Sequence, residues 1–219
     1  MAEPLKIRKS ATDTCADILR EDILNGRFDA PRSFIIDRVA ERLKVSPTPV
    51  REAVRKLEAE GLLEYSRGRG VVIRKLRSAE FDELVSLRQL IEPLLIRAAC
   101  KTADQRVLKV ARQQLDKWMV QQGSRPERYQ GQQLITDTLY ASTGLVRTIE
   151  ALNSITALIA RFHISVWQSS DEVYTRDFDF LTEMINQIEA RDPDAAVEAF
   201  QQRQTWAQTR VRAKLADPG

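Results

Sequence analysis

The sequence predicts a mainly α protein in two parts, of which only the first contains a small β-hairpin. Apolar residues recur with helical spacing along most of the chain. One short stretch, residues 62–73, is instead rich in β-branched residues and glycine. Aromatic residues make up only 6% of the 219 positions, which suits a helical protein better than a sandwich or barrel. With 43% apolar and 30% charged residues, the chain can bury a packed core.

Two helices are expected at the start of the chain. Cys15, Leu19 and Ile23 share one face of a helix over residues 12–25. A second apolar stripe predicts a helix over residues 34–44.

The third helix, over residues 47–60, is the most informative segment. Ser46 is expected at the N-cap and Pro47 at the first helical position, where a missing N–H has no consequence. Pro49 still falls within the first turn. The inward stripe is apolar, and a second face carries polar residues three and four apart: Thr48, Arg51 and Arg55.

After this helix, residues 62–73 are expected to form a hairpin. Its turn, SRGRG, contains Arg67, Gly68 and Arg69. A helix-turn-helix followed by a hairpin is a winged helix-turn-helix, and we expect it to form a DNA-binding domain over residues 1–76.

From Ser78 onward one helix follows another, which predicts an all-α bundle of six or seven helices over residues 77–219. Asp192 and Pro193 have the types expected at a helix start. The long first helix is expected to bury the leucines and isoleucine of its apolar stripe: Leu84, Leu87, Leu90, Ile91, Leu94 and Leu95. The expected helices cover residues 79–99, 104–120, 126–141, 145–168, 174–190 and 193–215.

Charge is divided unevenly between the two parts. Residues 1–77 hold 17 Lys and Arg against 12 Asp and Glu, whereas residues 78–219 hold 17 against 19. A basic excess confined to one part favours a nucleic-acid module joined to a neutral one.

Several function classes are excluded. One His and two Cys are too few for most zinc sites and nucleophile systems, and no phosphate-binding or hydrolase motif is present. We therefore expect neither an enzyme nor a cofactor. The sequence has no apolar run of membrane-spanning length and no secretory signal at its start, so we expect a cytoplasmic protein.

The outward face of the third helix is expected to read DNA. A helix of this length fits the major groove, where arginine pairs with guanine and threonine contacts a thymine methyl or a phosphate. The arginines of the hairpin suit the minor groove or its phosphates. The expected DNA-binding residues are Arg38, Ser46, Thr48, Arg51, Arg55, Arg67, Gly68 and Arg69.

The segment KVSPTPVREAVRKLEAEGLLEYSRGRGVVI resembles the GntR family of bacterial transcription regulators, over about residues 10–76. The resemblance implies that Ser46, Thr48 and Arg51 act on the recognition helix, and Arg67 and Gly68 on the wing. Two positions depart from the family pattern. Pro47 stands where the family usually has a base-reading arginine, and Asp37 stands where some members have a DNA-contacting arginine, with Arg38 beside it.

The helical remainder resembles the FCD (FadR C-terminal domain) branch of that family, through VSLRQLIEPLLIRAA and IEARDPDAAVEAF. Many FCD domains hold a metal with one Asp and three His. The matching positions here are Gln132, Thr136, Leu181 and Arg203, and the only His is His163. The resemblance therefore implies no metal site in this chain.

The resemblance also implies an effector pocket. Arg88 matches an FCD arginine that often faces the ligand, and with Arg203 it would clamp a carboxylate. Tyr140, His163 and Trp167 are expected to line the same cavity. An alternative stays open for each residue. Arg88 pairs with Glu92 as an ordinary surface pair, and Arg203 is a solvated helix residue. Tyr140 and Trp167 fill the core, and His163 is a satisfied interior or surface histidine.

Together these observations predict a homodimeric repressor that binds a palindromic double-stranded DNA operator and responds to an organic-acid-like metabolite. The alternative is a DNA-binding dimer whose helical part only dimerises and binds no effector.

Overall fold

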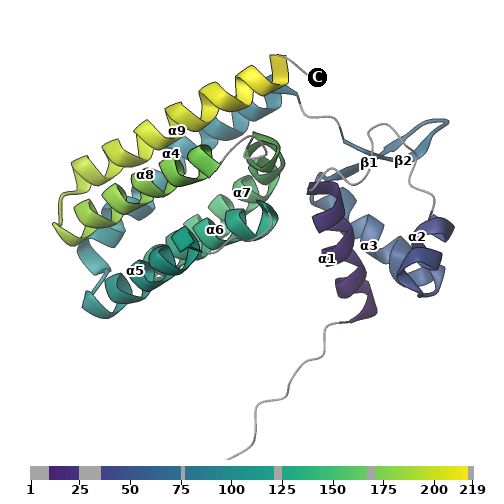
Figure 1. Cartoon of the computed structure of the whole chain (residues 1–219), viewed down its shortest axis with the longest axis horizontal. Helices are drawn as coiled ribbons and strands as arrows, with labels where there is room; N and C mark the ends of the chain where they lie inside the picture. The colour runs from purple at the N-terminus through teal and green to yellow at the C-terminus, as the bar shows by residue number, and fades with distance from the viewer. Residues whose placement is uncertain (1–9, 25–35, 75–76, 121–124, 167–170, 217–219) are drawn as a thin grey trace, which may run out of the picture. The chain divides into compact units, whose positions relative to one another are not determined.

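The computed structural model describes residues 10–24, 36–74, 77–120, 125–166 and 171–216 (Figure 1). Within the helices α6, α7 and α8, the side chains of residues 125–128, 161, 163–166 and 171–173 lie outside this description. The chain divides into two compact units, Met1–Lys75 and Leu76–Gly219.

The first unit is a winged helix-turn-helix, so the predicted fold class is confirmed. Its helices are α1 (Ala11–Leu24), α2 (Ile36–Leu43) and α3 (Pro47–Ala59), and its strands are β1 (Leu63–Ser66) and β2 (Gly70–Ile73). Helix α3 packs against α1, α2 and β1. The predicted inward stripe of α3 forms the centre of the core: Val50, Ala53, Val54 and Leu57.

Two helix ends fix the path of the chain around α3. Helix α2 ends with Lys44 in the left-handed region (φ 54°), and the Val45 N–H donates to the Ala40 carbonyl. Helix α3 ends in the same way at Gly61 (φ 70°), with the Leu62 N–H donating to the Leu57 carbonyl. In both turns this hydrogen bond satisfies a carbonyl that has no partner within the helix, and the left-handed residue turns the chain sharply.

The wing is a two-stranded antiparallel hairpin in which Leu63 pairs with Ile73 and Ser66 with Gly70. Its turn is closed by the Arg69 N–H, which donates to the Ser66 carbonyl at 3.0 Å. Gly68 (φ 81°) and Gly70 (φ 72°) adopt a conformation that strains other residues, so the turn depends on both glycines.

The second unit is all-α within its described residues. Its helices are α4 (Ser78–Thr102), α5 (Gln105–Val120), α6 (Arg125–Ala141), α7 (Val146–Val166), α8 (Asp171–Glu189) and α9 (Pro193–Ala216). Helices α8 and α9 pack together and both contact α4, while α5 packs on α6 (Figure 1). Pro93 lies inside α4 without ending it.

Asp side chains cap two of these helices. Asp192 accepts from the Asp194 and Ala195 N–H groups at 3.1 and 3.0 Å, which confirms the predicted start of α9. Asp104 accepts from Arg106 and Val107 before α5, and these backbone donors lower the pKa of its carboxyl.

The predicted burial of three leucines on α4 is wrong for this unit. Leu87, Leu90 and Leu94 are 41%, 73% and 57% exposed. They stand three and four residues apart and therefore share one face of the helix. The apolar stripe on α4 is thus wider than the surface that the other helices cover.

No helix among the described residues is both long and apolar enough to cross a membrane.

Candidate nucleic-acid interface and effector site

The first turn of α3 has few backbone donors. Ser46 is the N-cap with extended backbone (φ −70°, ψ 160°), but its side chain makes no capping hydrogen bond. A cap normally accepts from the second or third helical N–H, and the third position is Pro49, which has none. The Ser46 hydroxyl and the Thr48 residue are both exposed at this helix start. They are therefore open to an outside partner such as a phosphate.

The outward face of α3 carries the two predicted arginines, and both are exposed. Arg55 donates to Glu52 at 2.9 Å, so its charge is partly engaged. Arg51 has no ion-pair partner within the described part of the chain. A free guanidinium at the second turn of a helix can make bidentate contacts to a base edge.

Ion pairs hold α3 against α1 behind this face. Arg20 of α1 donates to both oxygens of Glu60 at 2.8 and 2.6 Å. Lys56 of α3 pairs with Asp13, and this hydrogen bond, together with those from Ser10, lowers the pKa of the Asp13 carboxyl from 3.8 to about 2. The opposite edge of α3 is therefore anchored while Arg51 stays free.

The wing turn presents Arg67 and Arg69, both exposed and without an ion-pair partner among the described residues. Gly68 lies between them, and a Cβ added there would meet nothing within 4 Å. Tyr65 on β1 is 75% exposed beside this turn. Tyr65 was not singled out from the sequence, where it only marks the first strand of the hairpin.

Arg38 lies on α2 and is exposed next to Asp37, which is exposed as well. Its place on the surface allows a contact to a DNA phosphate but does not require one.

In the helical unit, Arg88 and Glu92 of α4 form a fully buried ion pair. The Arg88 Nε and Nη2 atoms donate to the two oxygens of Glu92 at 2.5 and 3.3 Å, and both side chains are at most 2% exposed. Tyr140 of α6 donates its hydroxyl to Glu92 at 2.7 Å. Burial disfavours the charged form of Arg88, but the Glu92 carboxylate outweighs it and raises the pKa of Arg88.

A second buried pair lies in the same interior. Arg203 of α9 donates to both oxygens of Asp177 of α8 at 2.8 and 2.9 Å. Its charge interacts with Arg88 and Glu92, so the two pairs are neighbours. Tyr129 of α6 also interacts with both pairs, and burial raises the pKa of its phenol to about 12.

The structure thus brings together three of the five predicted effector residues: Arg88, Tyr140 and Arg203. Trp167 lies outside the described residues, and His163 lies on α7 with its side chain outside the description. We call the assembled set the buried polar cluster: Arg88, Glu92, Tyr129, Tyr140, Asp177 and Arg203.

The expectation that Arg88 and Arg203 are free to clamp a carboxylate needs correction. Each guanidinium already holds a carboxylate through two hydrogen bonds. The alternative of an Arg88–Glu92 pair is found, but inside the unit rather than at the surface. A solvated Arg203 is not found, because this residue is 5% exposed. Asp177, the partner of Arg203, was not singled out from the sequence.

One polar side chain on the inward face of α6 has no partner. Gln132 is 0% exposed, and neither its amide oxygen nor its amide nitrogen makes a hydrogen bond within the described structure. Thr136, one turn on, donates its hydroxyl to the Gln133 carbonyl. Buried amides are nearly always hydrogen-bonded, so Gln132 calls for an explanation.

The residues at the family's metal positions do not fit a metal. Leu181 offers no donor atom, and Arg203 is a cation that already pairs with Asp177. Gln132 and Thr136 alone would leave the ion under-coordinated. Among the described residues, no group of three or more His, Cys, Asp or Glu is placed to hold a metal.

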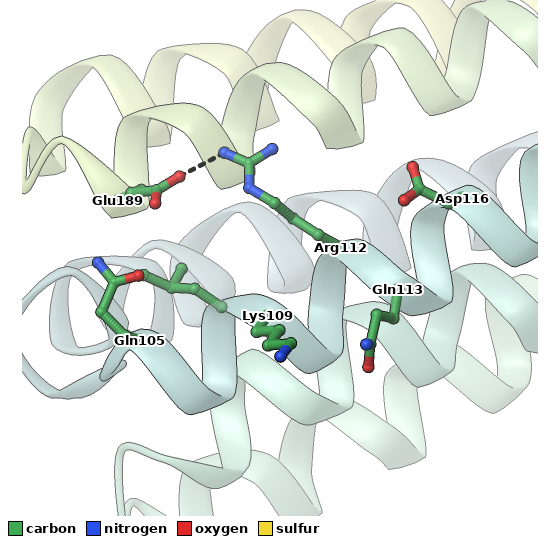
Figure 2. A pocket seen from close by; sticks show the side chains of 7 residues that line it. Gln105, Lys109, Arg112, Gln113, Asp116 and Glu189 are labelled. Carbon is green, nitrogen blue, oxygen red and sulfur yellow. Dashed lines mark hydrogen bonds and ion pairs between the residues drawn. The ribbon is translucent and has the colours of Figure 1, made fainter.

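A surface groove of about 410 Å³ lies on α5 and beside the end of α8 (Figure 2). Its central cation, Arg112, donates to Glu189 at 2.5 Å and to Asn186 at 3.0 Å. Because Arg112 is already paired and the walls of the groove are open, this groove is a weaker candidate than the buried polar cluster.

Comparison with known proteins matches these two units to two family models. Residues 11–73 match the gntR family of bacterial regulatory proteins, and residues 83–203, more than half of the chain, match the FCD domain. The chain belongs to the GntR family, in its FCD branch. The resemblance drawn from the sequence is therefore confirmed.

Three curated relatives of this GntR member are named as regulators. The Nta operon transcriptional regulator of Aminobacter aminovorans is 29% identical over 59% of this chain and 60% of its own length. The HTH-type transcriptional regulator YdhC of Bacillus subtilis is 32% identical over 45% of this chain and 44% of its own length. A D-xylose utilization operon repressor of Paenarthrobacter nicotinovorans is 33% identical over 42% of this chain and 41% of its own length. This GntR chain thus matches about two-fifths to three-fifths of each relative.

Solved structures share the fold over nearly the whole chain. E. coli McbR/YncC has a TM-score of 0.78 at 16% identity, covering 95% of this chain and 100% of that one. A GntR regulator from Rhodococcus sp. RHA1 has a TM-score of 0.70 at 21% identity, covering 94% and 99%. The family and the names of the relatives are those of regulators rather than enzymes, as the sequence predicts.

Proposed function

We propose that this protein is a transcription regulator that binds a two-fold symmetric DNA operator as a homodimer and responds to a small molecule in its helical unit. The observation that carries the DNA-binding part is Arg51. It is exposed and unpaired among the described residues, on a helix whose other edge is anchored to α1 by ion pairs.

In this proposal α3 enters the major groove. Arg51 pairs with a guanine, Thr48 contacts a thymine methyl or a phosphate, and Arg55 adds charge beside them. Ser46 at the helix start and Arg38 on α2 bind backbone phosphates.

The wing follows the DNA backbone in the same complex. Gly68 lets the chain approach closely, Arg67 and Arg69 bind phosphates or enter the minor groove, and Tyr65 donates its hydroxyl to a phosphate. Arg67→Ala is expected to weaken binding evenly across DNA sequences, because phosphate contacts do not read bases.

Dimerisation is supported by the exposed leucines of α4. Leu87, Leu90 and Leu94 form one apolar row, and such rows on soluble proteins usually mark an interaction surface. A second copy of the chain would cover this row and bring two winged helices to two half-sites. Light scattering should find a dimer for the wild type and for Met119→Asp, and a monomer for Leu90→Asp. A monomeric wild type would contradict this arrangement.

The effector part of the proposal rests on the buried polar cluster and on Gln132. Such a ligand changes DNA affinity only if it binds two states of the dimer unequally: the state that can bind DNA and the state that cannot. A carboxylate, the effector class expected from the sequence, would have to displace Glu92 or Asp177 from its arginine. The alternative proposal is that the helical unit only dimerises, which the apolar row on α4 alone would explain.

We propose further that the protein is a repressor and acts in the cytoplasm. The xylose relative is named as a repressor, and a dimer that occupies an operator can block transcription.

The proposed function is tested by titrating labelled DNA from upstream of the protein's own gene, at physiological salt, against random DNA. Fluorescence anisotropy should show specific binding, typically 10³-fold or more tighter than to random DNA. Equal, salt-sensitive binding to both DNAs would contradict the sequence-reading role.

A further inference from the structure

Gln132 and its surroundings restrict the kind of molecule that the helical unit can accept. The side chain is fully buried on α6, and both its amide oxygen and its amide nitrogen lack a hydrogen bond within the described structure. A methionine or leucine would fill similar space without leaving buried polar atoms unpaired. The amide is explained if a bound molecule supplies both missing partners.

Three hydroxyls carried by α6 donate to groups other than the Gln132 amide oxygen. The hydroxyl of Tyr140 donates to Glu92, that of Thr136 to the Gln133 carbonyl, and that of Tyr129 to the Thr156 carbonyl at 3.3 Å. Among the described residues, neither amide atom of Gln132 has a hydrogen-bond partner.

Each arginine of the buried polar cluster is balanced by a carboxylate. Arg88 is paired with Glu92, and Arg203 is paired with Asp177, each through two hydrogen bonds in a buried setting. A carboxylate ligand would add an uncompensated negative charge or break one of these pairs. A neutral ligand requires neither.

We propose that Gln132 is the specificity-determining residue of the effector site and that it recognises a neutral carboxamide or lactam group. The glutamine amide offers an acceptor and a donor side by side. A carboxamide or lactam presents the complementary donor and acceptor, so the two groups form a pair of hydrogen bonds without a net charge. The proposal depends on the proposed function in that the helical unit binds an effector, and it names the class of that effector.

The test uses matched amide and acid probes with the purified full-length protein: acetamide and acetate, benzamide and benzoate, nicotinamide and nicotinate. Ligand-observed saturation-transfer NMR titrations detect millimolar binding. For the pair that binds, we expect the amide to bind at least tenfold tighter than the acid. Gln132→Met should weaken amide binding at least tenfold, whereas Gln133→Met, the same change one position along α6, should leave it unchanged.

Thermal unfolding of the ligand-free variants supplies an independent readout. Gln132→Met should melt no lower than the wild type, because it removes an unpaired buried amide. A clear drop in its melting temperature would mean that the amide is already satisfied in the ligand-free protein, and it would overturn the proposal.

The binding outcomes separate this proposal from the proposed function. Tighter binding of the acids would overturn the neutral class while leaving an effector site in place. Binding of no probe, or amide binding that survives Gln132→Met, would overturn the role of Gln132. Neither result bears on the DNA-binding role, because the operator titration tests that role separately.

Discussion

Arginine serves opposite purposes in the two units of this protein. On α3 and the wing, Arg51, Arg67 and Arg69 are exposed and have no ion-pair partner within the described residues. Inside the helical unit, Arg88 and Arg203 are buried and each holds a carboxylate through two hydrogen bonds. The free arginines are available to phosphates and base edges. The paired ones are not: Arg88 holds Glu92 within α4, and Arg203 links α9 to Asp177 of α8. Residue type alone therefore does not identify a DNA-binding arginine. Whether a carboxylate already holds its guanidinium determines whether it is available to bind DNA.

The largest effect is expected when the carboxylate partner of a buried arginine is removed. Glu92→Ala leaves Arg88 buried and unpaired and removes the acceptor of Tyr140. We expect the free energy of unfolding to fall by about 3–5 kcal/mol. The control is Glu150→Ala, which removes the partner of the exposed Arg147 and should change stability by less than about 1 kcal/mol. Urea denaturation measures both, and similar losses would show that burial of the pair is unimportant.

The tight packing between α5 and α6 can be tested next. A Cβ added at Gly131 of α6 would lie 2.3 Å from the indole Cδ2 of Trp118 on α5. Gly131→Ala should therefore destabilise the protein by about 1–3 kcal/mol, although alanine favours helices. Combining it with Trp118→Phe, which makes room, should recover part of that loss. Fully additive effects in the same denaturation assay would mean that these two sites are not in contact.

On the DNA-binding side, the turn before α3 stores a small amount of strain. Lys44 has φ 54°, a conformation that glycine adopts more easily than lysine. Lys44→Gly should raise the free energy of unfolding by up to about 1 kcal/mol, whereas Lys44→Ala should give no such gain. If both variants were equally stable, the left-handed backbone would not be the source of the effect.

The smallest expected effect concerns the pH dependence of the exposed anchor between α1 and α3. Because the hydrogen bonds from Lys56 and Ser10 lower the pKa of Asp13 from 3.8 to about 2, the charged form stabilises the folded state above pH 3.8. This contribution disappears as the pH falls through about 2. Asp13→Asn should therefore flatten the fall in the urea midpoint between pH 4 and pH 2. An unchanged slope would show that the pair contributes nothing in solution.

The sequence was sufficient for the winged helix-turn-helix, because its signals are local. Ser46, Pro47 and Gly61 mark the ends of α3, and the predicted inward stripe of that helix is buried. Asp192 likewise marked the start of α9 correctly. Such caps act within a few residues and can be recognised from spacing.

The interior of the helical unit was not predictable in the same way. An Arg–Glu pair four residues apart has one sequence pattern whether it is buried, like Arg88 and Glu92, or exposed. The partner of Arg203 is Asp177, 26 residues away on another helix. The exposure of Leu90 depends on which helices cover α4, and spacing along one helix does not carry that information.

Within the described residues, Arg51 and Arg55 of α3 differ in whether a carboxylate holds the guanidinium. The decisive measurement is the affinity of wild type, Arg51→Ala and Arg55→Ala for operator and random DNA at one salt concentration. Arg51→Ala should weaken operator binding by about 1–3 kcal/mol and leave binding to random DNA nearly unchanged. Arg55→Ala, whose guanidinium is held by Glu52, should have a smaller effect on the operator. Equal losses on operator and random DNA for Arg51→Ala would contradict a base-reading role.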